Sequence, residues 1–157
     1  MPRSRCNVMR TPAVSTLCDV NVLLALVTDR HAAHTAAVFW LNGVPAGDAA
    51  ICRIAQTGLL RLLNNPAVMR ADVLDTDACW RIWYRLLEDD RIRFTPTEPS
   101  GLDAVFERFT SGRAFTPRLW MDAYLASYAQ VSGLVLVTFD QGFHQFDSLA
   151  CHVLDVG

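Results

Sequence analysis

The sequence predicts an α/β domain in which helices cover both faces of a central parallel sheet, in three layers. Two observations predict this fold class. Segments typical of strands alternate with segments typical of helices, which is the order of a parallel sheet built with crossover helices. One strand segment, residues 134–139, is almost wholly apolar, as expected of a strand that is covered on both faces.

The first half of the chain is expected to contribute two strands and three helices. In order, these are strand 16–19, helix 23–27, helix 31–41, strand 48–52 and helix 54–63. Asn42-Gly43 ends the second helix, because glycine just after the last helical residue is a common stop signal. Apolar residues recur at helical spacing in the third helix, and Asn64-Asn65-Pro66 breaks it.

The second half is expected to contribute three helices and three strands. In order, these are helix 76–88, strand 92–95, helix 102–109, helix 117–131, strand 134–139 and an edge strand 152–154. Thr116 and Pro117 are typical of the cap and the first position of a helix, and Gly133 marks its end. Residues 134–139 follow at once, and because nearly all of them are apolar they are expected to form a strand inside the sheet.

The charge of the chain argues against nucleic-acid binding by a broadly basic surface. The 157 residues carry a formal net charge of -2, and all 14 positively charged side chains are arginines. A protein that binds nucleic acid mainly by neutralising phosphates is usually basic. Any nucleic-acid role of this chain must therefore rest on a local site.

The cysteines predict reduced thiols rather than a disulfide framework or a zinc site. Their number is odd, and no two of them have Cys-x-x-Cys spacing; they are Cys6, Cys18, Cys52, Cys79 and Cys151. Three of them lie inside apolar stretches, which is typical of buried thiols in a cytoplasmic protein.

The ends and apolar runs of the chain predict a single cytoplasmic domain that does not enter a membrane. Residues 1–14 are expected to be a disordered leader, and residues 15–157 a single domain. The arginines near the start are not followed by the apolar run of a signal peptide. The longest apolar stretch, residues 20–27, is far too short to span a bilayer.

Three aspartates are expected at the carboxyl ends of the strands, where ligand sites of open α/β sheets lie. Asp19 ends the first strand, and Asp140 directly follows the strongest strand. Asp122 lies in an apolar context near the start of the helix that leads into that strand. Each also has a structural interpretation: Asp19 as a helix cap, Asp140 as a turn residue and Asp122 as a solvated helix residue.

Carboxylates gathered at one edge repel one another, and a divalent cation relieves that repulsion. Mg²⁺ and Mn²⁺ prefer oxygen ligands and are often shared between carboxylates and a substrate phosphate. Such a cation lowers the pKa of a bound water and polarises a phosphoryl oxygen. A chain with a net negative charge can therefore act on a negatively charged polymer, because the metal ion bridges the two.

Four segments, taken in order, resemble the motifs of PIN domains of the VapC kind. They are Asp19–Leu26, Ile51–Leu63, Trp120–Ala126 and Leu136–Phe143. Each falls at the structural position predicted for it, and together they span about Thr16 to Val156. One such motif would be weak, whereas four in order are a specific signal.

The resemblance implies a PIN-like three-layer fold for residues 15–157 and a metal-dependent endoribonuclease, the toxin half of a toxin–antitoxin pair. It implies that Asp19, Asp122 and Asp140 bind Mg²⁺ or Mn²⁺ and hydrolyse RNA with a metal-activated water. Asn21 and Thr138 would be supporting polar groups. Homodimerisation and inhibition by a small antitoxin protein are implied as well.

The chain departs from the family's pattern at Gln56, where the second motif commonly carries a glutamate. A glutamine offers a carbonyl oxygen but no negative charge. Three interpretations stay open: one tightly held metal assisted by Gln56, weak metal binding with slow cleavage, or a PIN-fold protein that binds a partner or RNA without catalysis. A phosphatase with an aspartyl-phosphate intermediate is disfavoured, because Asn21 stands where its second aspartate is wanted.

Arginines and aromatic residues supply the remaining candidates. Four arginines are candidate RNA contacts with surface salt bridges as the alternative: Arg53, Arg61, Arg113 and Arg118. The aromatic residues Trp80, Trp83 and Tyr84 share the helix at 76–88. Core packing is favoured for them over a dimer or antitoxin surface.

Overall fold

A five-stranded parallel sheet forms the centre of the protein, in a computed structural model that describes residues 14–157. The expected leader, residues 1–14, lies outside the described residues except for Val14. The strands are β1 (Thr16–Cys18), β2 (Ala49–Cys52), β3 (Ile92–Thr95), β4 (Val135–Thr138) and β5 (Cys151–Val153). They pair in the order β3-β2-β1-β4-β5, and every pair is parallel.

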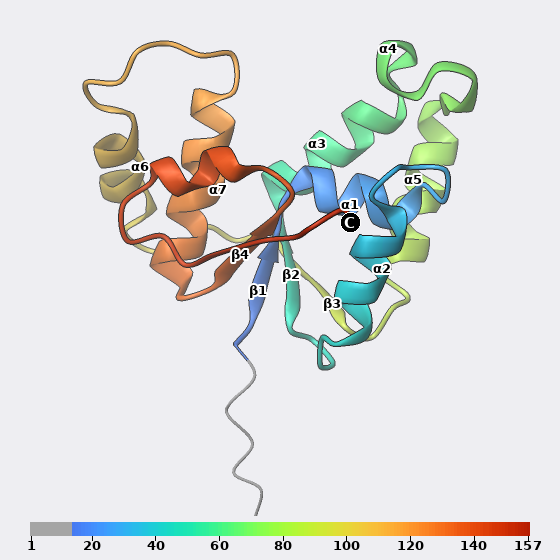
Figure 1. The fold of residues 1–157 in the computed structure, drawn as a ribbon, viewed down its shortest axis with the longest axis horizontal. Coiled ribbons are helices and arrows are strands. Elements are labelled where there is room, and N and C mark those ends of the chain that lie inside the picture. Colours follow the sequence, from blue (N-terminus) through green and yellow to red (C-terminus); the bar gives the residue numbers. More distant parts are fainter. Residues whose placement is uncertain (1–13) are drawn as a thin grey trace, which may run out of the picture.

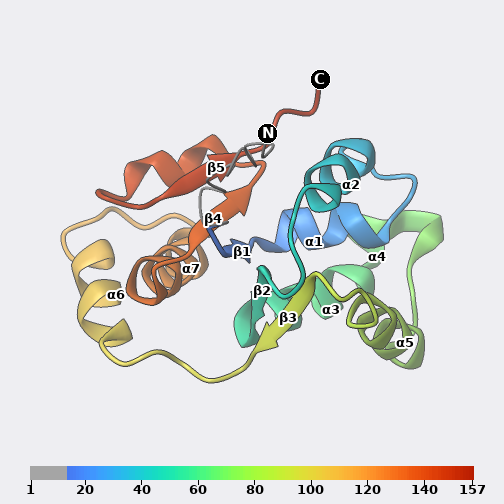
Figure 2. The same ribbon diagram turned by 90° about the horizontal axis from the view of Figure 1, so that it is seen from below.

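Helices cover both faces of this sheet, which confirms the predicted fold class. Residues 14–157 form the α-helices α1 (Val20–Val27), α2 (His34–Asn42), α3 (Arg53–Leu63), α4 (Pro66–Met69), α5 (Thr76–Leu86), α6 (Leu102–Thr110) and α7 (Leu119–Ser132), with 3-10 turns η1 (Arg70–Asp72) and η2 (Gln141–Gln145). Helices α6 and α7 lie on one side of the sheet, and α1, α2, α3 and α5 lie on the other (Figures 1 and 2).

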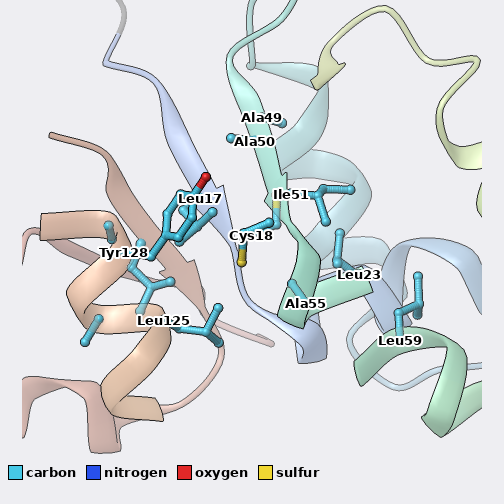
Figure 3. Close-up of a cluster of buried hydrophobic side chains, with 14 of the residues drawn as sticks. Leu17, Cys18, Leu23, Ala49, Ala50, Ile51, Ala55, Leu59, Leu125 and Tyr128 are labelled. Carbon is cyan, nitrogen blue, oxygen red and sulfur yellow. The ribbon is translucent and has the colours of Figure 1, made fainter. Parts of the chain in front are cut away.

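The core forms on both faces of the inner strands. Leu17 is fully buried and lies toward α7, near Leu125 and Tyr128, whereas Ile51 lies toward Leu23 and Leu59 on the opposite side (Figure 3). All four residues of β2 are fully buried. A strand with two covered faces must be apolar at every position, which is why the sequence shows runs rather than alternation.

The parallel arrangement brings the starts of several helices to one edge of the sheet. Helix α1 begins just after β1, with Asp19 between them, and α3 begins directly after β2. The turn η2 likewise follows β4 closely, after Phe139 and Asp140. Polar residues at these strand–helix junctions therefore meet at the carboxyl edge.

The start of α7 corrects one prediction. The helix begins at Leu119 with Arg118 as its cap residue, not after a cap at Thr116. Residues 116–119 form a turn instead, in which the Leu119 amide donates to the Thr116 carbonyl at 3.2 Å. The capping signal was outweighed by burial of Leu119, which is 7% exposed and fixes where the helix enters the core.

Two further boundaries differ from the sequence prediction. The second helix begins at His34 rather than His31, because the His31 ring accepts a hydrogen bond from the Ala33 amide and forms a turn. Asn64-Asn65-Pro66 ends α3 as predicted but also starts α4, since the Asn65 side chain accepts from the Ala67 amide and Pro66 takes the first helical position.

The aromatic residues of α5 divide between the core and the surface. Trp83 is 2% exposed and meets Phe94 edge to face at 5.1 Å between ring centroids. Trp80 and Tyr84 are 44% and 62% exposed and stack on each other at 6.0 Å. Core packing is thus confirmed for Trp83 and wrong for the other two, because a helix packed on one side presents residues 80 and 84 on its outer face.

Two smaller predictions are tested by the described residues. The thiols of Cys18, Cys52, Cys79 and Cys151 are free, and the first three are buried, as predicted. Between residues 14 and 157, no helix is both long and apolar enough to cross a membrane.

Candidate active site

Asp19 lies at the junction of β1 and α1 and is 5% exposed. One carboxylate oxygen, Oδ1, accepts from the Val20 amide at 2.6 Å and caps the helix, so the capping interpretation is correct as far as it goes. The other oxygen, Oδ2, accepts from the Thr138 hydroxyl at 2.6 Å. Burial is the main cause that raises the pKa of Asp19, and these two hydrogen bonds oppose it.

Thr138, the last residue of β4, links the two aspartates that follow the strands. Its side chain is fully buried, and its hydroxyl oxygen accepts from the Asp140 amide at 3.0 Å while donating to Asp19. Asn21 completes the network: its Nδ2 donates to Thr138 Oγ1 at 3.2 Å, and its Oδ1 accepts from the Phe139 amide at 3.3 Å. These hydrogen bonds fix the position of strand β4 relative to helix α1 around Asp19.

Asp140 is the cap residue of the turn η2. Its Oδ1 accepts from the Gly142 amide at 2.8 Å, which is the turn role that the sequence allowed. Its Oδ2 is 2.9 Å from Nη2 of Arg118. One oxygen of Asp140 therefore shapes the loop, while the other faces the site.

Asp122 lies in the first turn of α7, and its side chain is only 15% exposed, so it is not a solvated helix residue. Burial raises its pKa to about 6, with further contributions from the negative charges of Asp19 and Asp140. Arg118 opposes this rise; its Nε lies 3.9 Å from Asp122 Oδ2. The carboxylate repulsion expected from the sequence is present in the folded site.

A cavity of about 250 Å³ opens at this edge of the sheet, between α1, α3 and α7. Asp19, Asn21, Asp122, Arg61 and Arg118 are among the residues that line it. Glycine at position 58 lets α1 and α3 approach here, since a Cβ atom on Gly58 would lie 2.7 Å from Cγ2 of Val20. Gly58 belongs to the walls of the cavity and was not singled out from the sequence.

The donor set suits a hard divalent cation, although the side chains are not arranged around one. Asp19, Asp122 and Asp140 offer only oxygen atoms, and their mutual repulsion favours a cation. Among residues 14–157, however, no group of three or more His, Cys, Asp or Glu side chains is placed so that it could hold a metal ion. The positive charge between the carboxylates is the guanidinium of Arg118.

Gln56 is buried at 3% exposure, and its carbonyl oxygen accepts a hydrogen bond from an arginine. Oε1 accepts from Nη1 of Arg53 at 2.5 Å. The Arg53 guanidinium also lies over the Phe94 ring, 4.8 Å from its centroid. Gln56, like Asp140, is not among the residues that line the cavity, and the hydrogen bond of its side chain is to Arg53.

The other arginine candidates differ in how firmly they are held. Both terminal nitrogens of Arg113 donate to Gln145, at 2.9 and 3.0 Å, and the guanidinium stacks over Phe146. Arg113 therefore ties the loop before α7 to η2. Arg61 is exposed and lines the cavity beside Asp122. Arg118 and Asp122 are four residues apart, a spacing from which their ion pair could have been predicted.

The fold and its acidic edge define the class of protein. The sequence profile of the PIN domain matches residues 16–149, from β1 through η2. Ribonuclease VapC41 of Mycobacterium tuberculosis is 39% identical over 142 residues, which cover 88% of this chain and 97% of that protein. The chain therefore belongs to the PIN-domain family and, within it, to the VapC-type toxin ribonucleases.

Solved structures share the fold at lower identity. VapC20 of Mycobacterium tuberculosis, described as a toxin that cleaves the sarcin–ricin loop, superposes with a TM-score of 0.64 at 16% identity, over 90% of this chain and all of that one (100%). VapBC2 of Rickettsia felis, solved with a DNA fragment from its promoter, has a TM-score of 0.62 at 12% identity, over 89% of this chain and 98% of that one.

Proposed function

We propose that the protein is a divalent-metal-dependent endoribonuclease, the toxin of a toxin–antitoxin pair, that uses the acidic edge of its sheet as the active site. The supporting observation is that Asp19 and Asp122 line one cavity, and that Asp140 is joined to them through Arg118 and Thr138. The 39% identity to a named VapC ribonuclease over nearly the whole chain supports RNA hydrolysis.

Asp19, Asp122 and Asp140 would hold the cation, which is Mg²⁺ or Mn²⁺ in this proposal. When bound, such a cation supplies a Lewis acid that lowers the pKa of water and neutralises charge on a phosphate. Thr138 and Asn21 fix the orientation of Asp19 through the hydrogen bonds described above. Arg61 and Arg118 line the cavity wall, which supports a role for both in contacting the phosphate backbone of RNA.

The test is cleavage of a mixed RNA pool by the purified protein with Mg²⁺, Mn²⁺ or a chelator. Asp122→Asn and Asp140→Asn remove one charge each while keeping the shape, and the amide side chain of the second variant still offers an oxygen to the Gly142 amide. We expect roughly 100-fold or greater loss of cleavage in each. Asp147→Asn, at an exposed aspartate outside the site, is the matched control and should cleave as the wild type does.

Two outcomes decide against this proposal. Full cleavage by either site variant would show that these aspartates are not the active site. Absence of metal-dependent cleavage by folded protein, tested with several RNA classes and free of antitoxin, would favour the binding-only alternative that Gln56 raised.

The partners proposed are RNA, a cognate antitoxin and a second copy of the chain. VapBC2 was solved as an assembly with promoter DNA, which supports an antitoxin partner. The exposed pair Trp80 and Tyr84 is of the residue types enriched at protein interfaces. Light scattering on the purified protein tests the dimer, and co-expression with any small protein that is encoded directly upstream of the gene tests the antitoxin.

A further inference from the structure

Arg118 places one positive charge against two of the three site carboxylates. Its Nη2 is 2.9 Å from Asp140 Oδ2, and its Nε is 3.9 Å from Asp122 Oδ2. The same charge also lowers the pKa of Asp19, against the effect of burial. A single guanidinium thus offsets repulsion among all three carboxylates of the proposed metal site.

The Arg118 side chain is poorly anchored compared with its neighbour in the same loop. It is 63% exposed, and in the described part of the chain its polar contacts are these two ion pairs. Arg113 instead donates two hydrogen bonds to Gln145 and stacks on Phe146. Exposed ion pairs contribute little to stability, so the guanidinium can leave the carboxylates at small cost.

A divalent cation and this guanidinium would be two positive charges held by the same pair of carboxylates. Arg118 approaches Oδ2 of both Asp122 and Asp140, so a cation held by these two carboxylates would bring a second positive charge close to the guanidinium. Positive charges at such a separation repel strongly in a partly buried site. Binding of one therefore opposes binding of the other.

On the basis of the proposed function, we propose that Arg118 is an internal counter-ion that competes with the divalent cation for Asp122 and Asp140. Displaced by the cation, the guanidinium stays at the cavity wall, where it contacts an RNA phosphate. One side chain then serves two partners in turn: the carboxylates of the free protein and the phosphate of the substrate. Metal binding and substrate binding are thereby coupled.

The direct test is calorimetric titration of the full chain with Mn²⁺, comparing wild type with Arg118→Gln. We expect the variant to bind Mn²⁺ about tenfold more tightly, because the competing charge is gone. Arg61→Gln is the matched control: Arg61 lines the same cavity, but its charge makes no ion pair with a carboxylate in the described structure. It should change the affinity much less.

Thermal unfolding gives a second readout that does not depend on catalysis. In chelator, Arg118→Gln should unfold a few degrees lower than wild type, since the carboxylates lose their counter-ion. Saturating Mn²⁺ should reverse this order. Because Arg118 is largely exposed, the variant is expected to fold, and circular dichroism verifies this.

Kinetics test the second half of the proposal. At saturating Mn²⁺, Arg118→Gln should raise KM for a short RNA substrate several-fold, although it binds the metal more tightly. Opposite changes in metal affinity and substrate affinity distinguish the proposed exchange from loss of a merely structural contact, which would weaken both.

The outcomes separate this proposal from the one on which it rests. If the wild type binds Mn²⁺ and both Arg118→Gln and Arg61→Gln bind it with the same affinity as the wild type, the counter-ion role is overturned and the metal site is left intact. Weaker Mn²⁺ binding in Arg118→Gln would also overturn it. Absence of Mn²⁺ binding in wild type and in every variant would overturn both proposals together.

Discussion

Thr138 is the residue on which the geometry of the acidic edge depends most. Its buried hydroxyl contacts Asp19, Asn21 and the amide of Asp140, so it joins β4 to α1. A hydroxyl can donate once and accept twice, and here all three capacities are used. The hydroxyl donates its single hydrogen to Asp19, and this hydrogen bond reduces the free-energy cost of burying the Asp19 carboxylate.

Replacing Thr138 with valine keeps the shape of the side chain and removes this donor. We expect the free energy of unfolding to fall by about 1–3 kcal/mol, because a buried carboxylate oxygen loses its hydrogen bond. Urea denaturation measures this value. Thr138→Ser, which keeps the hydroxyl, should lose distinctly less, and equal losses in both variants would show that the methyl group is what matters.

Gln56 offers a prediction about charge. Gln56→Glu adds a carboxylate beside Arg53, which already donates to this side chain. We expect Mn²⁺ binding to tighten a few-fold, since the site gains negative charge that Arg53 only partly offsets. Calorimetry with Mn²⁺ measures it, and Arg53→Gln/Gln56→Glu should bind more tightly still. An unchanged affinity would show that position 56 is remote from the metal.

At the scale of elements, the contact of α1 with α3 sets the width of the site. Gly58 on α3 packs against Val20, the first residue of α1, and both line the cavity. Val20 directly follows Asp19, so a displacement of α1 at this point moves the carboxylate. The absent side chain at position 58 is therefore a geometric requirement of the site.

Gly58→Ala should destabilise the fold and disturb the site together. The added Cβ would lie 2.7 Å from Val20 Cγ2, and valine has little rotamer freedom with which to yield. We expect a net loss of about 1–2 kcal/mol, after the gain of ~1 kcal/mol that alanine brings to a helix. In the background of Val20→Ala, the same substitution should be neutral or stabilising, and a denaturation double-mutant cycle measures this coupling.

At the scale of the whole molecule, an ion pair far from the site ties a helix layer to the sheet. Arg91, just before β3, contacts both carboxylate oxygens of Asp89, at 2.8 and 2.6 Å. It also donates to the Leu41 carbonyl and to Asn42 at the end of α2. The hydrogen bonds from Arg91 lower the pKa of Asp89 below its usual value.

The ion pair between Arg91 and Asp89 should make the free energy of unfolding depend on pH in the acidic range. A carboxyl group with a lowered pKa contributes stability above its unfolded pKa, near 4, and loses it as the pH falls through the folded pKa. We expect Asp89→Asn to lose about 1 kcal/mol at neutral pH relative to wild type, with the difference shrinking below about pH 4. Denaturation across pH measures it, with exposed Asp90→Asn as the control; a difference independent of pH would contradict the ion-pair origin.

The sequence by itself determined the features that depend on local chemistry. Apolar runs such as residues 134–139 predicted the inner strands, because a strand covered on both faces has no polar position to spare. The aspartates after β1 and β4 followed from the same runs, since a charged residue ends an apolar strand. The four motifs then pointed to the PIN-domain family that the profile match shows.

Only the tertiary structure decided what depends on neighbours distant in sequence. The start of α7 moved from Thr116 to Leu119 because packing outweighed a capping signal, and Trp80 and Tyr84 proved exposed because nothing packs on that face within the described residues. Arg118 directly precedes α7, whereas Asp140 follows β4. Their ion pair therefore depends on how α7 packs against β4. Helix propensity and capping signals depend on residues a few positions apart in the sequence. Charge pairing in a site depends instead on how whole elements pack together.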